Sequence, residues 1–585
     1  MTDSGRLAAV IAAQYAAEPG LAGQPISITL RSDIVTLSGE VATWSDVVNA
    51  GHIAASVAGV AGVVNDLAAR DCPGTGRRAL QPRLPVPTGQ PPFTARQSQA
   101  DIVIIGGGVI GCAVARELSR YQAGIAIVER EWDVACGASK GNNGMIHPGV
   151  DPEPGTLKAK LSVRGVELYD QAARELDFQL VRCGLLGVVT DPDELFVLDI
   201  VKARAEDNGV PGVELLYGLE AVRRIEPAVT DRAVGAFYAP TTGMVSPYKV
   251  TLAYAENAVM NGVALHLGTS VIGLAVRDGA VTGVITDRGT ISCRLVINCA
   301  GIHSDDICAM ADAREFTIHP RRGELLIFDR AAGDRYRCAL SPFGLAYDPH
   351  TKGGGAMVTV DGNPEWGPTA TEVPDRDDRR AERDGLERVL EKFQPLLPGF
   401  PARDSVIAYY SGLRAATYHE DFHIGPSRFV RGLYNVAGIQ SPGLAAAPAI
   451  AEMVASEVRS LLSLGERADW QPLRREPPHL RDLGRAERDA LIAADARYGR
   501  IVCRCETVSE GEIVAAIHGR VPALSVDAVK RRTRAGMGRC QGGFCLPRVT
   551  AILARELCVP ATRITKKGPG SELFVAKAPS GRESA

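Results

Sequence analysis

Residues 101–131 read DIVIIGGGVIGCAVARELSRYQAGIAIVERE, and this stretch decides the fold of the chain. The apolar residues 102–105 predict a buried strand that runs into the glycine-rich loop 106–111. A helix is expected to follow, continuing through Arg120. Residues 125–128 predict a second strand, which ends at Glu129. This order of elements predicts an α/β domain of the Rossmann type that binds a dinucleotide.

Each glycine of the loop has a separate physical task. Gly106 allows the tight turn, Gly108 lets the backbone approach a pyrophosphate, and Gly111 lets the helix pack closely on the strand. The amides at the start of the helix then face the phosphate groups. Glu129 is placed to accept hydrogen bonds from the ribose hydroxyls, and an acid at this position disfavours the 2′-phosphate of NADP.

Three later segments favour FAD over NAD. A Gly/Ser/Asn-rich loop follows Glu129 and can supply donors along a long cofactor. LVINCAG (295–301) is a strand that ends in small residues, and NVAGIQSPGL (435–444) precedes a helix whose first amides would stabilise negative charge on a reduced flavin. Besides the residues above, the predicted FAD-binding residues are Arg130, Ser139, Asn143, Gly144, Val271, Gly301, Gly438, Ser441, Pro442, Gly443 and Leu444.

The motifs GGGVIGC, ERE, ASKGNNGMIH, NCAG, PRRGEL, YSGLRA and AGIQSPGL occur in this order over about residues 101–455. In this respect the chain resembles the FAD-dependent D-amino-acid-oxidase-type superfamily. The nearest branch is that of L-2-hydroxyglutarate oxidases and the catalytic subunit of anaerobic glycerol-3-phosphate dehydrogenase. The chain departs from the pattern in NNGMIHPG, and in His303, where some relatives carry Trp. Both departures bear on the substrate and not on the cofactor.

The resemblance implies a β-sheet lobe that caps the flavin and the substrate. This lobe is expected from residues 180–295 and 315–410, with VTGVITDR (281–288) and GELLIFDR (323–330) among its strands.

His147 and Arg414 are the candidate catalytic residues. Oxidation of an alcohol or amine carbon needs a base for the departing proton, and His147 titrates near neutral pH. The alternative is a histidine that only hydrogen-bonds its own loop. Arg414 suits a carboxylate or phosphate, since its guanidinium can bind both oxygens at once, although an ordinary ion pair is the alternative. Lower-ranked candidates are Tyr248, Lys352, His419 and His423, while His319 and Arg322 are expected only to position the RRGEL loop.

Four of the thirteen cysteines are clustered: Cys503 and Cys505 in CRCE, and Cys540 and Cys545 in CQGGFC. On a cytosolic chain such thiolates indicate a metal or a cluster, and neither spacing is the C-x-x-C of zinc knuckles. The segment resembles the bacterioferritin-associated-ferredoxin-like domain over nearly all of 500–560, which implies a 2Fe–2S cluster. Zinc, or a remnant without redox activity, is the alternative. Nearby cations are expected to offset the charge of the cluster: Lys530, Arg531, Arg532, Arg534 and Arg539.

Residues 1–71 predict a small α/β unit: a helix over 5–18, a two-stranded hairpin with its turn at Ser32-Asp33, a helix over 44–57 and a closing strand, GVVNDL. This unit resembles the BON domain, which implies a docking role toward a partner subunit or a membrane surface. The other predicted boundaries are a Pro/Gly-rich linker at 72–98, the oxidoreductase domain at 99–465, a helical connector at 466–499, a small helical iron–sulfur domain at 500–560 and a tail at 561–585.

Bulk properties narrow the function classes. A formal charge of −3 gives no reason to expect nucleic-acid binding. The N-terminus does not read as a signal peptide, and no apolar run reaches the ~20 residues that span a bilayer. The chain is therefore expected in the cytoplasm, with a peripheral contact at the inner membrane face left open.

These features together predict an FAD-dependent dehydrogenase. The resemblance implies a small anionic 2-hydroxy acid or polyol phosphate as substrate, similar to L-2-hydroxyglutarate or glycerol 3-phosphate. A flavin takes up two electrons and a 2Fe–2S cluster accepts one at a time, so a quinone or a protein is the expected final acceptor. Two alternatives remain: an amine or opine dehydrogenase subunit, and an electron-transfer subunit without its own substrate.

Overall fold

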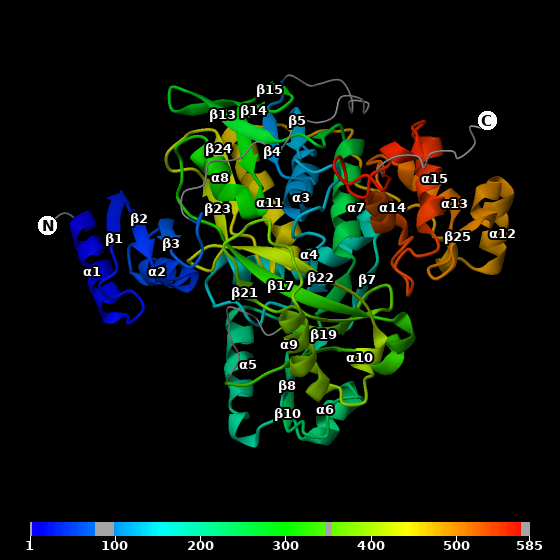
Figure 1. Ribbon diagram of the computed structural model, residues 1–585, viewed down its shortest axis with the longest axis horizontal. Coiled ribbons are helices and arrows are strands. Elements are labelled where there is room, and N and C mark those ends of the chain that lie inside the picture. Colours follow the sequence, from blue (N-terminus) through cyan, green and yellow to red (C-terminus); the bar gives the residue numbers. More distant parts are fainter. Residues whose placement is uncertain (1–2, 76–98, 346–353, 575–585) are drawn as a thin grey trace, which may run out of the picture.

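The computed structural model describes residues 3–75, 99–345 and 354–574. Most of the predicted linker, the end of the tail and Lys352 therefore lie outside the described residues. Two small units flank a large central body on opposite sides: the N-terminal unit lies at the left of Figure 1 and the C-terminal unit at the right. Within the described ranges, no helix is long and apolar enough to cross a membrane.

The N-terminal unit has the predicted order of elements. Its three-stranded sheet has β1 antiparallel to β2, and β2 parallel to β3. Thr43 caps α2 with a capping box completed by Asp46, which fixes the start of that helix. The helices end one residue earlier than predicted. The elements are α1 (Asp3–Ala17), β1 (Ile26–Arg31), β2 (Ile34–Val41), α2 (Trp44–Ser56) and β3 (Gly62–Ala69).

The central body contains a six-stranded sheet in the order β12-β5-β4-β16-β24-β23, parallel except for β23. Its strands are β4 (Ile102–Ile105), β5 (Ile125–Val128), β12 (Ala264–His266), β16 (Leu295–Asn298), β23 (His423–Pro426) and β24 (Leu433–Ala437). The covering helices are α3 (Val109–Leu118), α4 (Leu157–Leu176), α7 (Pro247–Met260), α8 (Ser304–Ala309) and α11 (Gly443–Leu462). Helix α3 ends two residues before the predicted Arg120.

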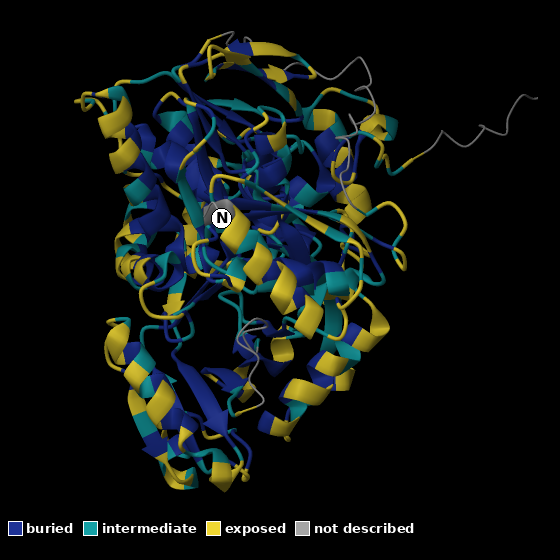
Figure 2. Cartoon of the chain, turned by 90° about the vertical axis from the view of Figure 1, so that its left-hand side faces the viewer, coloured by how far each residue is buried: buried dark blue, intermediate teal, exposed yellow. Residues whose placement is uncertain are grey.

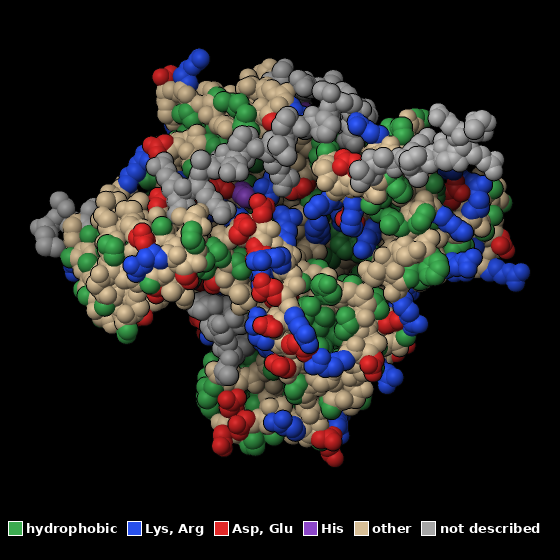
Figure 3. All heavy atoms as spheres, viewed as in Figure 1, with side chains coloured by type: hydrophobic (Ala, Val, Ile, Leu, Met, Phe, Trp, Pro, Cys, Tyr) green, Lys and Arg blue, Asp and Glu red, His purple; other side chains and the backbone are tan. Residues whose placement is uncertain are grey.

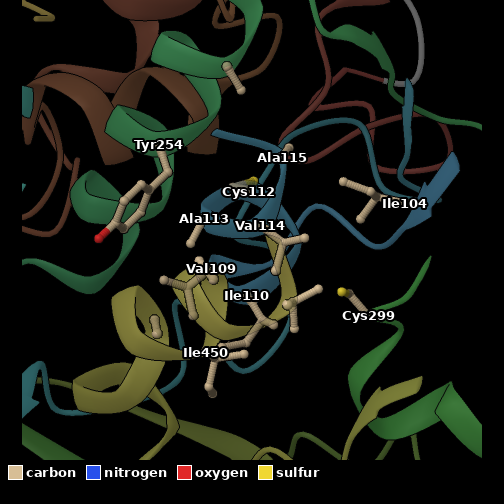
Figure 4. Close-up of a cluster of buried hydrophobic side chains, with 14 of the residues drawn as sticks. Ile104, Val109, Ile110, Cys112, Ala113, Val114, Ala115, Tyr254, Cys299 and Ile450 are labelled. Atoms are coloured by element: carbon tan, nitrogen blue, oxygen red, sulfur yellow. The ribbon is translucent and has the colours of Figure 1, made fainter. Parts of the chain in front are cut away.

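The core of this Rossmann-type layer is formed where α3 meets its neighbours. Val109, Ala113 and Val114 of α3 are buried together with Tyr254 of α7 and Ile450 of α11, as Figure 4 shows. Tight packing of small side chains on α3 lets the helix lie close to the sheet, which places the glycine turn at the edge of a large cavity.

A second, nine-stranded sheet forms the capping lobe in the lower half of Figures 1 and 2. Its longest strands pair antiparallel over their full length, with Arg321 opposite Arg414. Its strands are β8 (Leu185–Val189), β9 (Glu214–Tyr217), β10 (Gly235–Ala239), β17 (His319–Phe328), β18 (Ala339–Pro342), β19 (Gly355–Val358), β20 (Pro364–Gly367), β21 (Thr371–Glu372) and β22 (Val406–Ala416). Helices α5 (Val197–Asp207), α6 (Leu219–Ile225), α9 (Arg383–Phe393) and α10 (Ala402–Ser405) accompany it.

Two predictions about this lobe were wrong in detail. VTGVITDR lies in β14 (Ala280–Thr286), which pairs with β13 (Val271–Arg277) and β15 (Gly289–Ser292) in a separate antiparallel sheet beside the six-stranded one. Both segments read as β-strands in the sequence, and a strand pattern does not specify which sheet the strand joins. RRGEL is part of the buried strand β17 and not a loop. A third small sheet joins β6 (Met145–Ile146), β11 (Gly243–Val245) and β7 (Leu180–Arg182).

The C-terminal unit packs three helices on a short hairpin: β25 (Ile501–Cys503), β26 (Val508–Ser509), α13 (Glu510–Ile517), α14 (Val526–Thr533) and α15 (Leu546–Glu556). Ser509 caps α13 as predicted. The connector 466–499 is less helical than predicted, because only α12 (Arg485–Ala494) forms a regular helix in it. Pro477 and Pro478 lack the N–H group that a helix needs.

The two flanking units contact the central body through different chemistry. On the N-terminal side, the ring of Tyr418 enters the core of the BON-like unit, where its hydroxyl accepts a hydrogen bond from Asn65 at 3.0 Å. Arg314 pairs with Asp66 at 2.7 Å at the rim of the same contact. This contact is built around one aromatic side chain.

On the C-terminal side, buried charges carry the contact. Asp133 of the central body accepts hydrogen bonds from Arg531 and Arg532 of α14, and all three are buried. The two arginines hold the pKa of Asp133 near 2, against the opposing effect of burial. Removing one member of such a group typically costs about 3–5 kcal/mol, because a buried charge is left unpaired.

The predicted role of the nearby cations was therefore wrong for most of them. Arg531 and Arg532 bind Asp133, Arg534 binds Asp361 at 2.6 Å and Glu506 at 2.7 Å, and Arg539 pairs with Asp329. The buried Arg531, Arg532 and Arg534 fix the C-terminal unit on the central body, whereas Arg539 is exposed and near enough to Cys505 to interact with its thiol. Sequence proximity to the cysteines could not reveal carboxylates that lie hundreds of residues away.

Candidate FAD and iron–sulfur sites

A single large cavity lies between the glycine turn, the loop that follows Glu129, the strand pair β17–β22 and the start of α11. It contains about 1650 Å³ of empty space, part of it open to solvent. Most of the predicted FAD-binding residues line it: Gly106, Gly108, Glu129, Arg130, Ser139, Asn143, Gly301, Ser441, Pro442, Gly443 and Leu444. Residues from widely separated segments thus meet around one cavity.

The glycine turn has no room for larger side chains. Gly106 has φ +114°, and a Cβ there would lie 2.4 Å from the carbonyl oxygen of Cys299. A Cβ on Gly111 would lie 2.0 Å from the carbonyl oxygen of Gly106, so only glycine lets α3 follow β4 so closely. Val109 N–H donates to the Ser139 hydroxyl at 2.8 Å, which ties the turn to the loop after Glu129.

Glu129 braces the turn as well as facing the cavity. Its carboxylate accepts hydrogen bonds from Gly107 N–H at 2.6 Å and from Glu131 N–H at 2.8 Å. Burial raises its pKa despite these two bonds. Each carboxylate oxygen retains a second lone pair, so the two bonds leave acceptor capacity for ribose hydroxyls.

Four predicted FAD-binding residues do not line this cavity. Gly111 lies behind the turn and acts through packing alone. Gly144 (φ +71°) and Gly438 (φ +66°) occupy left-handed positions in turns, where a Cβ would approach neighbouring backbone. Val271 lines an adjacent hollow that shares Glu129 and Arg130 with the main cavity.

Both candidate catalytic residues, His147 and Arg414, line the cavity. The guanidinium of Arg414 donates to the carbonyl oxygen of Thr369 at 3.1 Å. Among the described residues, no carboxylate lies within 4.0 Å of it. Burial, reinforced by the neighbouring Arg321 cation, lowers the pKa of Arg414 to about 10. An arginine in this setting would gain from an anion in the cavity.

The lower-ranked candidates have other contacts. The Tyr248 hydroxyl donates to the sulfur of Met537 at 3.5 Å, at the contact with the C-terminal unit, and Tyr248 does not line the cavity. His419 contacts the carbonyl oxygen of Val60 in the BON-like unit, and His423 pairs with Glu315.

The positioning roles predicted for two residues of β17 agree with their contacts. His319 hydrogen-bonds Glu372 at 2.9 Å and stacks on Tyr418. Arg322 is buried and pairs with Glu324 and Asp378. Neither side chain lines the cavity.

Sequence reasoning missed several cavity residues. Arg379 places a guanidinium on the wall in addition to those of Arg130 and Arg414, and Gln440 stands beside the predicted Ser441. His303, noted only as a departure from the family pattern, lines the cavity and shares a hydrogen bond with Arg130 at 2.9 Å. The segment 435–444 could have suggested Gln440, whereas nothing around Arg379 in the sequence marks it.

The four clustered cysteines come together in crossed pairs, one member from each motif. The Cys505 and Cys540 sulfurs lie 3.7 Å apart. Cys545 hydrogen-bonds Cys503, which lowers the pKa of Cys503 to about 6. Thiolates on one tetrahedral iron or zinc, with metal–sulfur bonds of about 2.3 Å, lie roughly 3.7–3.8 Å apart. The four thiols therefore suit two irons, each held by one cysteine of either motif.

The two cysteine pairs differ in their exposure to solvent. Cys503 and Cys545 are each 2% exposed and belong to the hydrophobic core of the unit, whereas Cys505 is exposed and Cys540 is half-buried. A cluster held here would have one edge inside the protein and one edge at the surface.

A buried acid supports one wall of the cavity. The Tyr410 hydroxyl contacts both Glu365 at 2.5 Å and the carbonyl oxygen of Asn142, a cavity residue, at 3.0 Å. A tyrosine has one proton to donate, so both contacts are satisfied only when Glu365 is protonated and donates to Tyr410. Burial raises the pKa of Glu365 to about 7, in agreement with this count.

This arrangement predicts a pH dependence of stability. The folded-state pKa of Glu365 lies above its unfolded value, so its contribution is complete at acid pH and is lost as the pH rises through 7. Between pH 6 and pH 8.5 the loss should be about 1.4 kcal/mol. Urea titrations measure the free energy of unfolding at each pH. In Glu365→Gln, whose side chain stays neutral, this free energy should not show the loss of about 1.4 kcal/mol between pH 6 and pH 8.5. Glu391→Gln, at an exposed position, serves as the control; an unchanged decline in Glu365→Gln would contradict the assignment.

The glycine turn, the extended cavity and the crossed cysteines define a flavin-dependent oxidoreductase with an iron–sulfur centre. Sequence comparison agrees: residues 101–457 match the family described as FAD dependent oxidoreductase. The chain belongs to this family. Residues 501–555 match the BFD-like [2Fe-2S] binding domain, and residues 3–71 match the BON domain. The predictions of an FAD-dependent enzyme, its 2Fe–2S cluster and the BON domain are thereby confirmed.

Curated relatives point to the predicted branches. A glycerol 3-phosphate dehydrogenase from Caloramator mitchellensis is 40% identical over 477 residues, which cover 81% of this chain and 98% of the relative. An anaerobic glycerol-3-phosphate dehydrogenase from Escherichia coli is 26% identical over 79% of this chain and 89% of the relative. A human mitochondrial L-2-hydroxyglutarate dehydrogenase is 31% identical over 40% of this chain and 53% of the relative.

Among solved structures, the chain resembles the FAD-bound L-alpha-glycerophosphate oxidase from Mycoplasma pneumoniae. The TM-score is 0.60 with 26% sequence identity, and the match covers 65% of this chain and 99% of the oxidase.

Proposed function

We propose that the protein is an FAD-dependent dehydrogenase whose substrate is a small polyol phosphate of the glycerol 3-phosphate type. A small 2-hydroxy acid, such as L-2-hydroxyglutarate, is the neighbouring possibility within the same class. The observation that carries the proposal is Arg414, a guanidinium on the cavity wall that has no carboxylate partner among the described residues. The relative from Caloramator mitchellensis, a glycerol 3-phosphate dehydrogenase, supports the phosphate over the carboxylate.

The roles of the chain's own residues follow from this proposal. Arg414 binds the anionic end of the substrate through two parallel N–H donors, assisted by Arg379, another cation on the cavity wall. His147 accepts the proton of the substrate hydroxyl through its imidazole. FAD, when bound here, would supply a ring that accepts a hydride, and the first amides of α11, beginning at Gly443, would stabilise negative charge on that ring.

The C-terminal unit fits the same scheme as the exit for electrons. A quinone or a protein is the proposed final acceptor. The buried arginine contacts with Asp133 connect α14, which precedes the cysteine pair 540–545, to the loop that borders the cavity. The BON unit is proposed to dock the enzyme on a partner protein or a membrane surface.

Anaerobic addition of candidate substrates tests the proposal directly. We expect sn-glycerol 3-phosphate to bleach the visible absorption of the flavin, while glycerol, which lacks the anion, does so poorly. Bleaching by amines or opines but not by any hydroxy compound would favour C–N oxidation. No bleaching by any of these compounds would favour an electron-transfer role without a substrate.

Two variants separate the proposed roles. Arg414→Lys keeps the charge but cannot donate two parallel hydrogen bonds to the anion, and such a pair contributes about 1.5–3 kcal/mol of binding free energy. We therefore expect kcat/KM for glycerol 3-phosphate to fall ten- to a hundredfold. His147→Gln should instead lower kcat with little change in KM. Arg403→Lys, at an exposed ion pair with Glu387, is the control and should behave like the wild type. Unaltered kinetics in Arg414→Lys would show that Arg414 is structural.

A further inference from the structure

The C-terminal unit exposes an aromatic side chain beside its cysteines. Phe544, within CQGGFC, is 84% exposed, more than any other large hydrophobic side chain in the described part of the chain. Leu546, one residue past Cys545, is 37% exposed. Burying a phenylalanine side chain stabilises a protein by about 1.5–3 kcal/mol, and an exposed one loses this free energy. Its exposed position next to a redox centre therefore calls for an explanation.

Three exposed arginines lie within a few residues of Phe544 or of the clustered cysteines in the sequence. Arg504, Arg539 and Arg548 are all exposed. Arg539 pairs with Asp329, but neither Arg504 nor Arg548 has a carboxylate within 4.0 Å among the described residues. Residues 534–548 contain no Asp or Glu. Figure 3 shows Lys and Arg side chains together with apolar ones on this side of the molecule.

The exposed arginines contrast with the buried ones nearby. Arg531, Arg532 and Arg534 are buried and paired with carboxylates of the central body or of their own unit. Those arginines are used to hold the unit in place, whereas Arg504 and Arg548 remain available to a partner. The exposed thiol of Cys505 belongs to the same surface, so the outer edge of a bound cluster lies within it.

We propose that this surface, formed by Arg504, Cys505, Arg539, Phe544, Leu546 and Arg548 and here called the cluster face, docks an acidic one-electron carrier protein. An aromatic centre with an arginine rim is the composition of a protein interface, and the rim requires a negative partner. The inference rests on the proposed function, in which electrons leave through the C-terminal unit. Each substrate oxidation releases two electrons, so two carrier molecules are reduced per turnover.

A binding measurement tests the cluster face without any substrate. Cytochrome c supplies a matched pair of probes on one scaffold: the native basic protein, and the same protein made acidic by succinylation of its lysines. We expect the FAD- and cluster-loaded protein to bind the succinylated form at least tenfold more tightly at low ionic strength, with the difference lost in high salt. Equal affinity for the two forms would overturn the proposal.

Variants locate the binding site. Arg504→Glu combined with Arg548→Glu should weaken binding of succinylated cytochrome c at least tenfold, and Phe544→Ser should weaken it severalfold. The controls are exposed residues elsewhere: Arg277→Glu combined with Arg383→Glu, and Leu461→Ser, which is 58% exposed in the wild type. Iron and FAD contents confirm that every variant is loaded. Unchanged binding in the cluster-face variants would place the partner elsewhere.

Electron delivery gives a second readout. After reduction with dithionite, the wild type should reduce succinylated cytochrome c faster than the cluster-face variants do. If instead ubiquinone in liposomes is reduced at equal rates by wild type and variants while neither cytochrome binds, the acceptor is a quinone and the proposal fails. The substrate assay is separate: no bleaching by any substrate, together with charge-selective binding, would refute the proposed substrate class alone.

Discussion

Gly111→Ala is expected to yield a folded protein that contains no FAD. The added Cβ would lie 2.0 Å from the carbonyl oxygen of Gly106 and 3.4 Å from the side chain of Ile104. The first of these neighbours is backbone within the turn itself, so it cannot rotate away. The clash is removed only if α3 moves away from β4. The turn that faces the cavity then loses the geometry that brings its amides to a pyrophosphate.

The matched control is Gly399→Ala, where the same methyl group meets no atom within 4 Å and the backbone is not in the left-handed region. Flavin released by acid and quantified per chain should fall more than tenfold in Gly111→Ala and stay unchanged in Gly399→Ala. The FAD-free variant should keep its far-UV circular dichroism, because the remaining core around Tyr254 and Ile450 does not depend on the turn. Full occupancy in Gly111→Ala would contradict this account of the turn.

The glycine turn could be predicted from sequence because its physics is local. A strand, a positive-φ glycine, a close helix approach and an acid at the end of the next strand all lie within thirty residues. The BON-like unit was predicted in the same way, from one hairpin and the helices on either side of it. In both cases, neighbours in the sequence are also neighbours in space.

Features that depend on distant partners could not be predicted. Arg531 and Arg532 lie a few residues from the cysteines in the sequence, but their carboxylate is Asp133, about four hundred residues away. Tyr248 looked like a substrate residue by its motif and instead contacts Met537 of the C-terminal unit. Charge and aromatic character show what a side chain can do, whereas the partner depends on how the domains dock.

The residues that line the cavity also divide into those that a sequence motif marks and those that depend on distant parts of the chain. His147 and Arg414 were predicted from motifs, and both line it. Arg379, which adds a further cation to the wall, has no motif around it and lies in the segment between β21 and α9. The protonated state of Glu365 depends on Tyr410 and Asn142, and these three residues come from three different segments. Such a network is visible only once the capping sheet has formed.

Cys545→Ser is expected to remove the iron–sulfur cluster completely and to leave FAD in place. Cys545 is buried, contacts Cys503, and supplies one of four anionic sulfur ligands. A serine hydroxyl remains protonated near neutral pH and cannot replace a thiolate on iron. The FAD cavity should be unaffected, since every residue that lines it lies between Gly106 and Leu444, outside the cysteine-bearing unit.

Cys558→Ser provides the control, because Cys558 is exposed, lies in the same unit and is not one of the four. Iron analysis and the paramagnetic signal of the reduced protein should both be lost in Cys545→Ser and kept in Cys558→Ser. The unit should stay docked in either variant, since the buried contacts of Arg531 and Arg532 with Asp133 do not involve the cysteines.

Substrate should therefore still bleach the flavin of Cys545→Ser, while delivery of electrons to succinylated cytochrome c stops. Stoichiometric zinc without iron in wild-type protein purified anaerobically would instead identify the four thiolates as a structural metal site, and electrons would then have to leave the flavin by another route.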